Sequence, residues 1–371
     1  MLHTIRKALS IIFLVLFIYS FHIILVDIQP QSHVVNAKKK IIPVNCTEPL
    51  HKEQVDLIAP SSKGKAALEE SKKYVADLNL YPHVSASIYN GNSPFYAAPD
   101  AYRAEDLIQA LTDNSEIIWC IRGGMGAALL IPYLENLPKE QKEKIAQNKH
   151  KKTLIGFSDI TVLHTYLQNK FDWQNIHATM PDLIVRDKVA PDSINKLMEL
   201  IGGKQTSIVY HNLKQLSNGS KVTHLESKII GGNMTLIRDT IGTPWQINPK
   251  NKILFLEDVN EQPHKIERTL VHFKQSGLLD GIDALIFGDF CDSGNTQLME
   301  IVQKRFAKSV DFPVFTISGI GHDYISNPLP LNTHTTIQVE NTKEGFFSIR
   351  IENIDLFKTK GIKCVYETRQ I

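Results

Sequence analysis

Short apolar runs that end in turns, each followed by a helical pattern, constrain the fold of this 371-residue chain most. The run 116–121 leads into Arg122-Gly123-Gly124-Met125-Gly126, and a helical pattern follows over 127–137. A second run, Thr153-Leu154-Ile155, precedes a helical pattern over 159–170. Continuous apolar runs are typical of strands covered on both faces, and strand–turn–helix repeats are typical of parallel sheets. The sequence therefore predicts an α/β fold with a parallel sheet.

The domain organisation follows from where this pattern is interrupted. A chain of this length predicts two domains. The stretch 187–220 is polar, and we expect it to be a linker that leads into the second domain. An N-terminal α/β domain is expected over 55–186 and a C-terminal mixed α/β domain over 221–365, with a cleft between them. The end of the second domain, 335–358, alternates as antiparallel strands do.

Charge and cysteine content exclude several classes of function. The 41 basic and 39 acidic residues give a formal net charge of +2, which provides no electrostatic footprint for a nucleic-acid partner. The four cysteines are too scattered for a disulfide framework, and no CxxC pair indicates a structural zinc site.

The first residues are typical of a targeting segment. Arg6 and Lys7 precede an apolar stretch over 8–26, so we expect a signal peptide or membrane anchor over 1–37 and a linker over 38–54. The body would then be exported or anchored on the outer, periplasmic side, touching the membrane only through this segment. The basic cluster 38–40 disfavours export, which leaves a cytoplasmic body as the alternative. A buried core helix is a third interpretation.

Ser158 is the candidate nucleophile. It stands in Gly156-Phe157-Ser158-Asp159, between an apolar strand and a helix, where a turn can present its hydroxyl above the sheet. The backbone N–H of Asp159 can then serve as an oxyanion donor. The fifth position is Ile160 rather than glycine, so the motif alone is weak and also fits a serine or aspartate that only caps the helix.

Glu257 and His322 are the candidate acid and base. Glu257 lies at the carboxyl end of an expected buried strand, where ligand crevices of open α/β sheets form. His322 follows Ser318-Gly319-Ile320-Gly321 after the last apolar strand. The order serine, acid, histidine is that of α/β-hydrolases, in which the histidine removes the serine proton and the acid orients the histidine. A turn acid and a surface histidine are the alternative interpretations.

The glycine loop 122–126 is a second candidate feature. It lacks the third glycine of a dinucleotide-binding loop because position 129 is Leu129, and no Walker pattern is present. Glycines after a strand can instead let a substrate approach the backbone, whose N–H groups then act as donors. A glycine turn required only by packing is the alternative.

These residues stand in an ordered set of motifs that resembles the LD-carboxypeptidase family of serine peptidases. This family, the muramoyltetrapeptide carboxypeptidases, includes the microcin C immunity peptidases. The resemblance covers roughly 55–352. The motifs that carry it are Leu57-Ile58-Ala59-Pro60-Ser61, Arg122-Gly123-Gly124-Met125-Gly126, Gly156-Phe157-Ser158-Asp159-Ile160-Thr161, Gly231-Gly232-Asn233-Met234-Thr235, Ile241-Gly242-Thr243-Pro244-Trp245, Leu256-Glu257-Asp258-Val259-Asn260-Glu261, Gly321-His322 and Leu329-Pro330-Leu331.

The resemblance implies a role for each candidate. Ser158 would be the nucleophile, Glu257 the acid and His322 the base, with oxyanion donors from the backbone of Gly124 and Asp159. It also implies two domains with the site between them, no metal or organic cofactor, and often a homodimer. Members that recycle peptidoglycan cut between an L-centre diamino acid and a terminal D-alanine.

Three departures from the family pattern concern substrate and compartment. Met125 stands where a tyrosine is usual, which alters the expected pocket, and the arginine common in the following helix is absent from 127–130. The export-type segment is the third, because most recycling members are cytoplasmic. Arg122 could bind a substrate carboxylate or hold the glycine loop in place.

The predicted function is a serine carboxypeptidase that hydrolyses an LD bond in peptidoglycan-derived tetrapeptides. A microcin C-type immunity peptidase or amidase is the enzymatic alternative, favoured by the change at Met125. A muropeptide-binding protein without catalysis is the other alternative, and the complete triad disfavours it.

Overall fold

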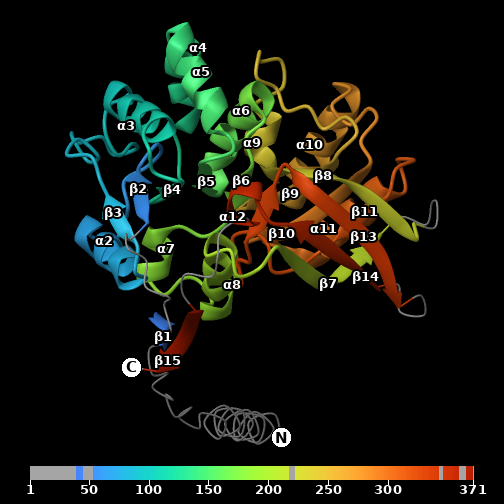
Figure 1. Ribbon diagram of the computed structural model, residues 1–371. Helices are drawn as coiled ribbons and strands as arrows, with labels where there is room; N and C mark the ends of the chain where they lie inside the picture. Colours follow the sequence, from blue (N-terminus) through green and yellow to red (C-terminus); the bar gives the residue numbers. More distant parts are fainter. Residues whose placement is uncertain (1–38, 45–52, 217–221, 342–345, 359–364, 371) are drawn as a thin grey trace, which may run out of the picture. The chain divides into compact units, whose positions relative to one another are not determined.

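The computed structural model describes residues 39–44, 53–216, 222–341, 346–358 and 365–370 (Figure 1). The predicted targeting segment, 1–37, lies outside these residues, as does most of the predicted linker 38–54. Within the described ranges, no helix combines the length and the apolar character that a membrane crossing requires.

The first sheet contains the predicted parallel strands. Its order is β12-β6-β5-β4-β2-β3, in which neighbours pair in parallel except for the antiparallel edge strand β12. The strands are β2 (Gln54–Ile58), β3 (Tyr81–His83), β4 (Ile117–Cys120), β5 (Thr153–Gly156), β6 (Asn175–His177) and β12 (Leu329–Leu331). The runs 116–121 and 153–155 are therefore strands, as predicted.

Helices cover both faces of this sheet (Figure 1). Within β4, Ile117 and Trp119 pack into one apolar core while Ile118 and Cys120 pack into another, because successive side chains of a strand point to opposite faces. Both cores are completed by helical residues. The helices are α2 (Leu68–Asp77), α3 (Asp100–Thr112), α4 (Ile131–Glu135), α5 (Lys139–Asn148), α6 (Thr161–Phe171), α7 (Pro181–Val185) and α8 (Pro191–Ile201).

The second lobe is a closed barrel in the order β10-β11-β7-β14-β13-β8-β9. The pairs from β8 through β9 and β10 to β11 are parallel, and the remaining pairs are antiparallel, which confirms the expected mixed α/β domain. The strands are β7 (Ser207–Gln215), β8 (His224–Asn233), β9 (Ile253–Val259), β10 (Ala284–Cys291), β11 (Val314–Thr316), β13 (Thr333–Asn341) and β14 (Phe346–Glu352). The helices are α9 (Met234–Arg238), α10 (Pro263–Gln275), α11 (Thr296–Ala307) and α12 (Asp355–Lys358). Two further strands, β1 (Lys39–Val44) and β15 (Val365–Gln370), pair with each other.

The stretch 187–220 is more than the expected linker. Helix α8 belongs to the core of the first lobe, and β7 is already a barrel strand, so the barrel begins at Ser207 rather than 221. In β7, Ile208, Tyr210 and Leu213 are buried while the intervening polar residues are more exposed. A strand with one solvated face contains as many polar as apolar residues, which is why its composition resembles that of a connection.

Candidate active site

Glu257 and His322 form a close pair although they lie 65 positions apart in the sequence. Glu257 stands near the carboxyl end of β9, opposite Asn233 of β8, and its side chain is fully buried. His322 lies in the loop after β11, and its Nδ1 is 2.6 Å from Oε2 of Glu257. The two residues predicted from their strand-end positions are therefore in hydrogen-bond contact.

The loop that carries His322 is held by a bulge in β10. The register between β10 and β9 shifts between Phe287 and Phe290, and Asp289 lies in this bulge. Its carboxylate accepts a hydrogen bond from the Gly319 N–H at 3.0 Å, and its own N–H donates to the Ile320 carbonyl at 3.0 Å. These bonds fix the backbone just before His322.

Each member of the Glu257–His322 pair shifts the pKa of the other. Burial acts to raise the pKa of Glu257, but the charge and hydrogen bond of His322 outweigh it, and the pKa lies below its ordinary value. Burial acts to lower the pKa of His322, but Glu257 opposes this more strongly and the pKa lies above its ordinary 6.5. A carboxylate that stabilises an imidazolium in this way is what general-base catalysis requires.

Ser158 occupies a strained turn between β5 and α6. Its φ is +63°, a left-handed conformation that non-glycine residues rarely adopt and that clusters at functional sites. The neighbouring Phe157 ring lies 4.6 Å from the ring of His322, centroid to centroid. The structure thus brings the serine turn to the histidine loop, and the hydrogen bonds of the described residues include none between Ser158 and His322 themselves.

The glycine loop packs directly against this turn and against the segment after β2. A Cβ added at Gly123 would lie 3.0 Å from the Cβ of Ser158, and one at Gly124 (φ +111°) would lie 2.3 Å from Oγ of Ser62. Ser62 in turn accepts a hydrogen bond from the Met125 N–H at 3.3 Å. Only glycine fits such a close approach, and among the described residues no group accepts a hydrogen bond from the Gly124 N–H.

The Asp159 side chain joins the loops rather than capping the helix. Its carboxylate accepts hydrogen bonds from the Ser61 hydroxyl at 2.6 Å and from the Ala127 N–H at 2.9 Å. Burial raises its pKa, although both hydrogen bonds act to lower it. The expected helix-cap alternative for Asp159 is wrong, because this carboxylate ties three separate segments together next to Ser158.

Arg122 and Met125 differ in exposure and contacts. Arg122 donates a hydrogen bond to the Lys63 carbonyl at 2.8 Å, which favours a role in holding the glycine loop. Met125, which belongs to the same loop, is 48% exposed.

Arg103 was not among the sequence-based candidates. Its side chain comes from α3, is buried, and donates hydrogen bonds to the carbonyls of Pro60, Ala98 and Gly126 and to the carboxylate of Asp100. It therefore anchors both loops behind the Ser158 turn. Nothing in the helical pattern of 100–112 distinguishes it from a solvated arginine, so only long-range contacts identify it.

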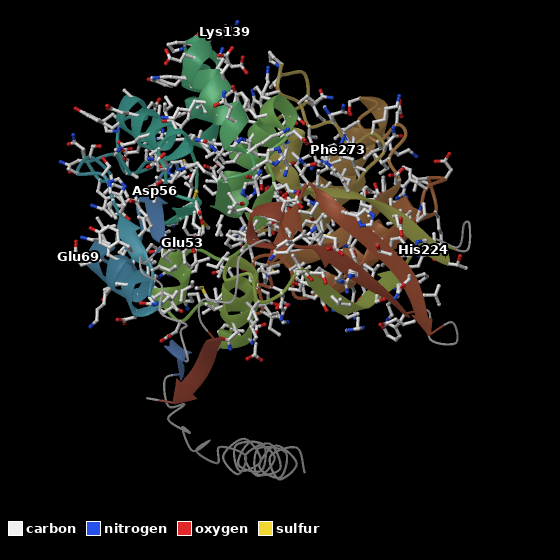
Figure 2. The ribbon with its side chains drawn as sticks, in the orientation of Figure 1. Glu53, Asp56, Glu69, Lys139, His224 and Phe273 are labelled. Carbon is white, nitrogen blue, oxygen red and sulfur yellow. The ribbon has the colours of Figure 1, made fainter. Side chains whose placement is uncertain are left out.

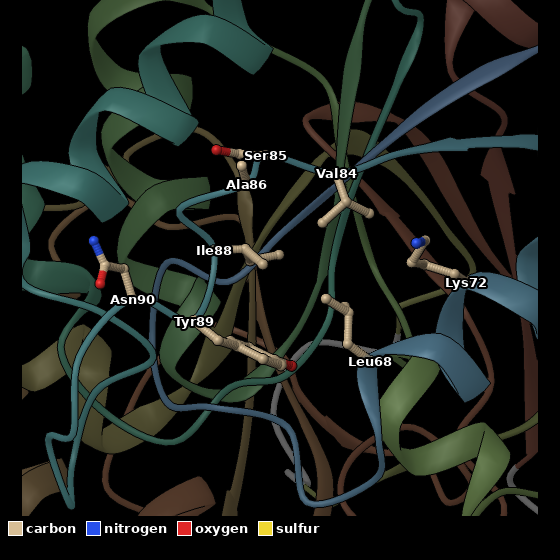
Figure 3. Close-up of a pocket in the computed structure, with 8 residues that line it drawn as sticks. All are labelled: Leu68, Lys72, Val84, Ser85, Ala86, Ile88, Tyr89 and Asn90. Atoms are coloured by element: carbon tan, nitrogen blue, oxygen red, sulfur yellow. The ribbon is translucent and has the colours of Figure 1, made fainter.

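Two other features of the first lobe lie apart from these residues. Asp56 on β2 (Figure 2), His83 and Asp113 bring potential metal-ligand atoms within 4.8 Å of one another. Lys152 donates a hydrogen bond to Asp113 and Ser115 donates one to Asp56, so protein groups already occupy part of this cluster's ligand atoms. A hollow of about 400 Å³ between α2 and the segment 84–90 is lined by none of Ser158, Glu257 and His322, and Figure 3 shows the side chains around it.

The comparisons with known proteins agree over most of the chain. Residues 55–178 match the LD-carboxypeptidase N-terminal domain, and residues 226–337 match the LD-carboxypeptidase C-terminal domain. A putative carboxypeptidase of Rickettsia conorii is 37% identical over 76% of this chain and 87% of its own length. The murein tetrapeptide carboxypeptidase of Pseudomonas aeruginosa is 28% identical over 72% of this chain and 88% of its own length.

Solved structures show the same fold. The muramoyltetrapeptide carboxypeptidase of Oxalobacter formigenes superposes with a TM-score of 0.69 at 22% identity, covering 81% of this chain and 98% of that one. A MccF-like protein of Bacillus anthracis gives a TM-score of 0.69 at 18% identity, covering 83% and 99%.

The two-lobed α/β fold and these matches define the chain as a peptidase, a hydrolase of peptide bonds. More specifically, it belongs to the LD-carboxypeptidase family, as the ordered motifs predicted.

Proposed function

We propose that this protein is a serine-type LD-carboxypeptidase that releases terminal D-alanine from peptidoglycan-derived tetrapeptides. The observation that carries the proposal is the buried Glu257–His322 pair beside the strained turn of Ser158. The names of the murein peptide carboxypeptidases among the relatives support the substrate class.

In the proposed mechanism, Ser158 Oγ attacks the scissile carbonyl while Nε2 of His322 takes the hydroxyl proton. Glu257 holds the imidazole through Nδ1 and stabilises the imidazolium. The N–H groups of Gly124 and Asp159 receive the developing oxyanion, where one such donor is worth about 10²–10³ in rate. His322 then gives its proton to the leaving amine, and water releases the peptide from Ser158 by the reverse proton path.

The test is hydrolysis of a tetrapeptide that ends in an L-centre diamino acid followed by D-alanine. We expect release of D-alanine by the wild type and a loss of about 10³-fold or more in Ser158→Ala, because triad members act as a unit. Ser207→Ala, at the start of β7, is the matched control. A tetrapeptide that ends in L-alanine tests the bond preference. A Ser158→Ala variant that keeps more than a tenth of the activity would exclude Ser158 as the nucleophile.

The exposed Met125 side chain favours a second candidate substrate class. Where the family usually has a tyrosine, this methionine leaves a flexible apolar surface beside the proposed oxyanion loop. An aminoacyl-nucleotide conjugate, offered in parallel with the tetrapeptide, distinguishes an immunity-type peptidase or amidase from a murein peptidase. Saturable binding of the tetrapeptide without turnover of either compound would instead indicate a non-catalytic muropeptide-binding protein.

We also propose that the body lies outside the cytoplasmic membrane, exported or tethered through the segment 8–26. The basic pair before this segment orients its N-terminal end toward the cytoplasm.

A further inference from the structure

Four aromatic rings form a column that runs from His322 into the protein. The ring centroids of His322 and Phe157 are 4.6 Å apart, those of Phe157 and His177 are 5.5 Å apart, and those of His177 and Phe255 are 5.6 Å apart. His177 ends β6 and pairs with Gly156, so it lies directly beside the strand that leads to Ser158. Phe255 precedes Glu257 by two residues on β9, which places both on the same face of that strand.

Several polar atoms around this column have no hydrogen-bond partner within the described part of the chain. They are Oε1 of Glu257 and both ring nitrogens of His177; the neighbouring His164 ring lies near the Leu154 carbonyl, whose hydrogen bond acts to raise the pKa of His164. All three side chains are fully buried. Buried polar groups in proteins are almost always hydrogen-bonded, to protein or to an enclosed water. No direct hydrogen bond joins the free carboxylate oxygen of Glu257 to a ring nitrogen of His177, so a water enclosed between them is the partner that would satisfy both.

The charges of these groups act on one another. Burial lowers the pKa of His177 to about 4, with the charge of Glu257 opposing this and that of His322 adding to it. Burial also lowers the pKa of His164 to about 3, with a further contribution from His177. The two inner imidazoles are therefore neutral near pH 7, when each has one N–H donor and one acceptor nitrogen. A neutral donor can bind Glu257 without placing a second cation beside His322.

We propose that His177 is a positioning residue for the catalytic pair: its neutral imidazole donates a hydrogen bond to an enclosed water that in turn donates to Oε1 of Glu257. Oε2 of the same carboxylate accepts from Nδ1 of His322, so the two hydrogen bonds together hold the carboxylate plane in one orientation. This inference rests on the proposed function, because it assigns His177 to the same site.

The test compares His177→Phe, which keeps a ring but has no donor, with His177→Gln, which restores an N–H donor. His272→Phe, on the exposed side of α10, is the matched control. We expect kcat for the tetrapeptide to fall about 10–100-fold in His177→Phe with KM nearly unchanged, and to recover to within a few-fold of wild type in His177→Gln. The acid limb of kcat/KM should move to higher pH in His177→Phe, because a carboxylate that lacks one donor retains the shared proton of the pair more strongly.

A second readout does not depend on turnover. The proton between His322 and Glu257 should give a far-downfield ¹H NMR resonance, which we expect to shift in His177→Phe and to return toward its wild-type position in His177→Gln. A folded His177→Phe variant with wild-type kcat, pH profile and resonance would refute the positioning role. If His177→Phe does not fold, the comparison is between His177→Gln and the wild type. A His177→Gln protein whose resonance and kcat both differ widely from those of the wild type would then refute the positioning role. Should the wild type leave the tetrapeptide intact, the proposed function fails, while the resonance still tests His177.

Discussion

Replacing Glu257 with glutamine removes one negative charge from the centre of the site and almost no volume. In the wild type, Oε2 of this fully buried carboxylate lies 2.6 Å from Nδ1 of His322. The variant keeps a side chain of the same shape, but its neutral amide no longer stabilises an imidazolium. The change therefore separates the electrostatic role of Glu257 from its packing.

The change should lower kcat/KM and also shift its pH dependence toward lower pH. A hydrogen bond to a charged group contributes about 1.5–3 kcal/mol already in the resting enzyme, and more when His322 becomes charged during the reaction. We therefore expect kcat/KM to fall about 10³–10⁴-fold, which corresponds to about 4–5.5 kcal/mol of transition-state stabilisation. The residual activity should also extend to lower pH. Burial lowers the pKa of His322 and Glu257 is the main group that raises it, so the acid limb should move from above 6.5 to below 6.5.

The assay is kcat/KM for tetrapeptide hydrolysis measured from pH 5 to pH 9. Glu261→Gln, the same chemical change four residues further on beside Lys265, should leave both the rate and the limb almost unchanged. A Glu257→Gln enzyme with a reduced rate but an acid limb still above 6.5 would contradict the assignment of Glu257 as the group that raises the pKa of His322.

Three further changes test other parts of the structure. Arg103→Met should lower the free energy of unfolding in urea by about 2–4 kcal/mol, because it leaves the buried carbonyls of Pro60 and Ala98 without the donor that Arg103 supplies. The exposed Arg305→Met should cost less than about 0.5 kcal/mol, and equal effects of the two changes would contradict the anchoring role. Burial raises the pKa of Asp289 to about 6, so its contribution to stability is complete below the unfolded value of 3.8 and is lost as pH rises through about 6. Wild type should therefore lose on the order of 2 kcal/mol relative to Asp289→Asn between pH 4 and pH 7, and parallel stability curves would refute this. Phosphatase and fluorescent-protein reporters fused after residue 50 should give phosphatase activity without cytoplasmic fluorescence. The opposite pattern would indicate that the body lies in the cytoplasm.

The sequence by itself determined the local elements and the identities of the candidate residues. Apolar runs buried on both faces predicted β4 and β5, because such composition is stable only between two layers of helices. The ordered motifs around Ser158, Glu257 and His322 predicted the family, which the comparisons confirm. The pairing of Glu257 with His322 was a prediction from strand ends, and the structure brings the two together.

Only the tertiary structure decided which distant segments share a layer. Strand β12 comes from the C-terminal half of the chain but pairs with β6 in the first sheet, and β7 joins the barrel from a stretch that is polar enough to resemble a linker. Local sequence patterns likewise do not predict that Asp159 binds Ser61 and Ala127. They also do not predict that His177 packs against Phe157. The physical reason is the same in each case. Hydrophobic periodicity indicates which residues of a helix or strand are buried. The role of a buried polar side chain depends instead on its hydrogen-bond partner, and in these cases that partner lies far away along the chain.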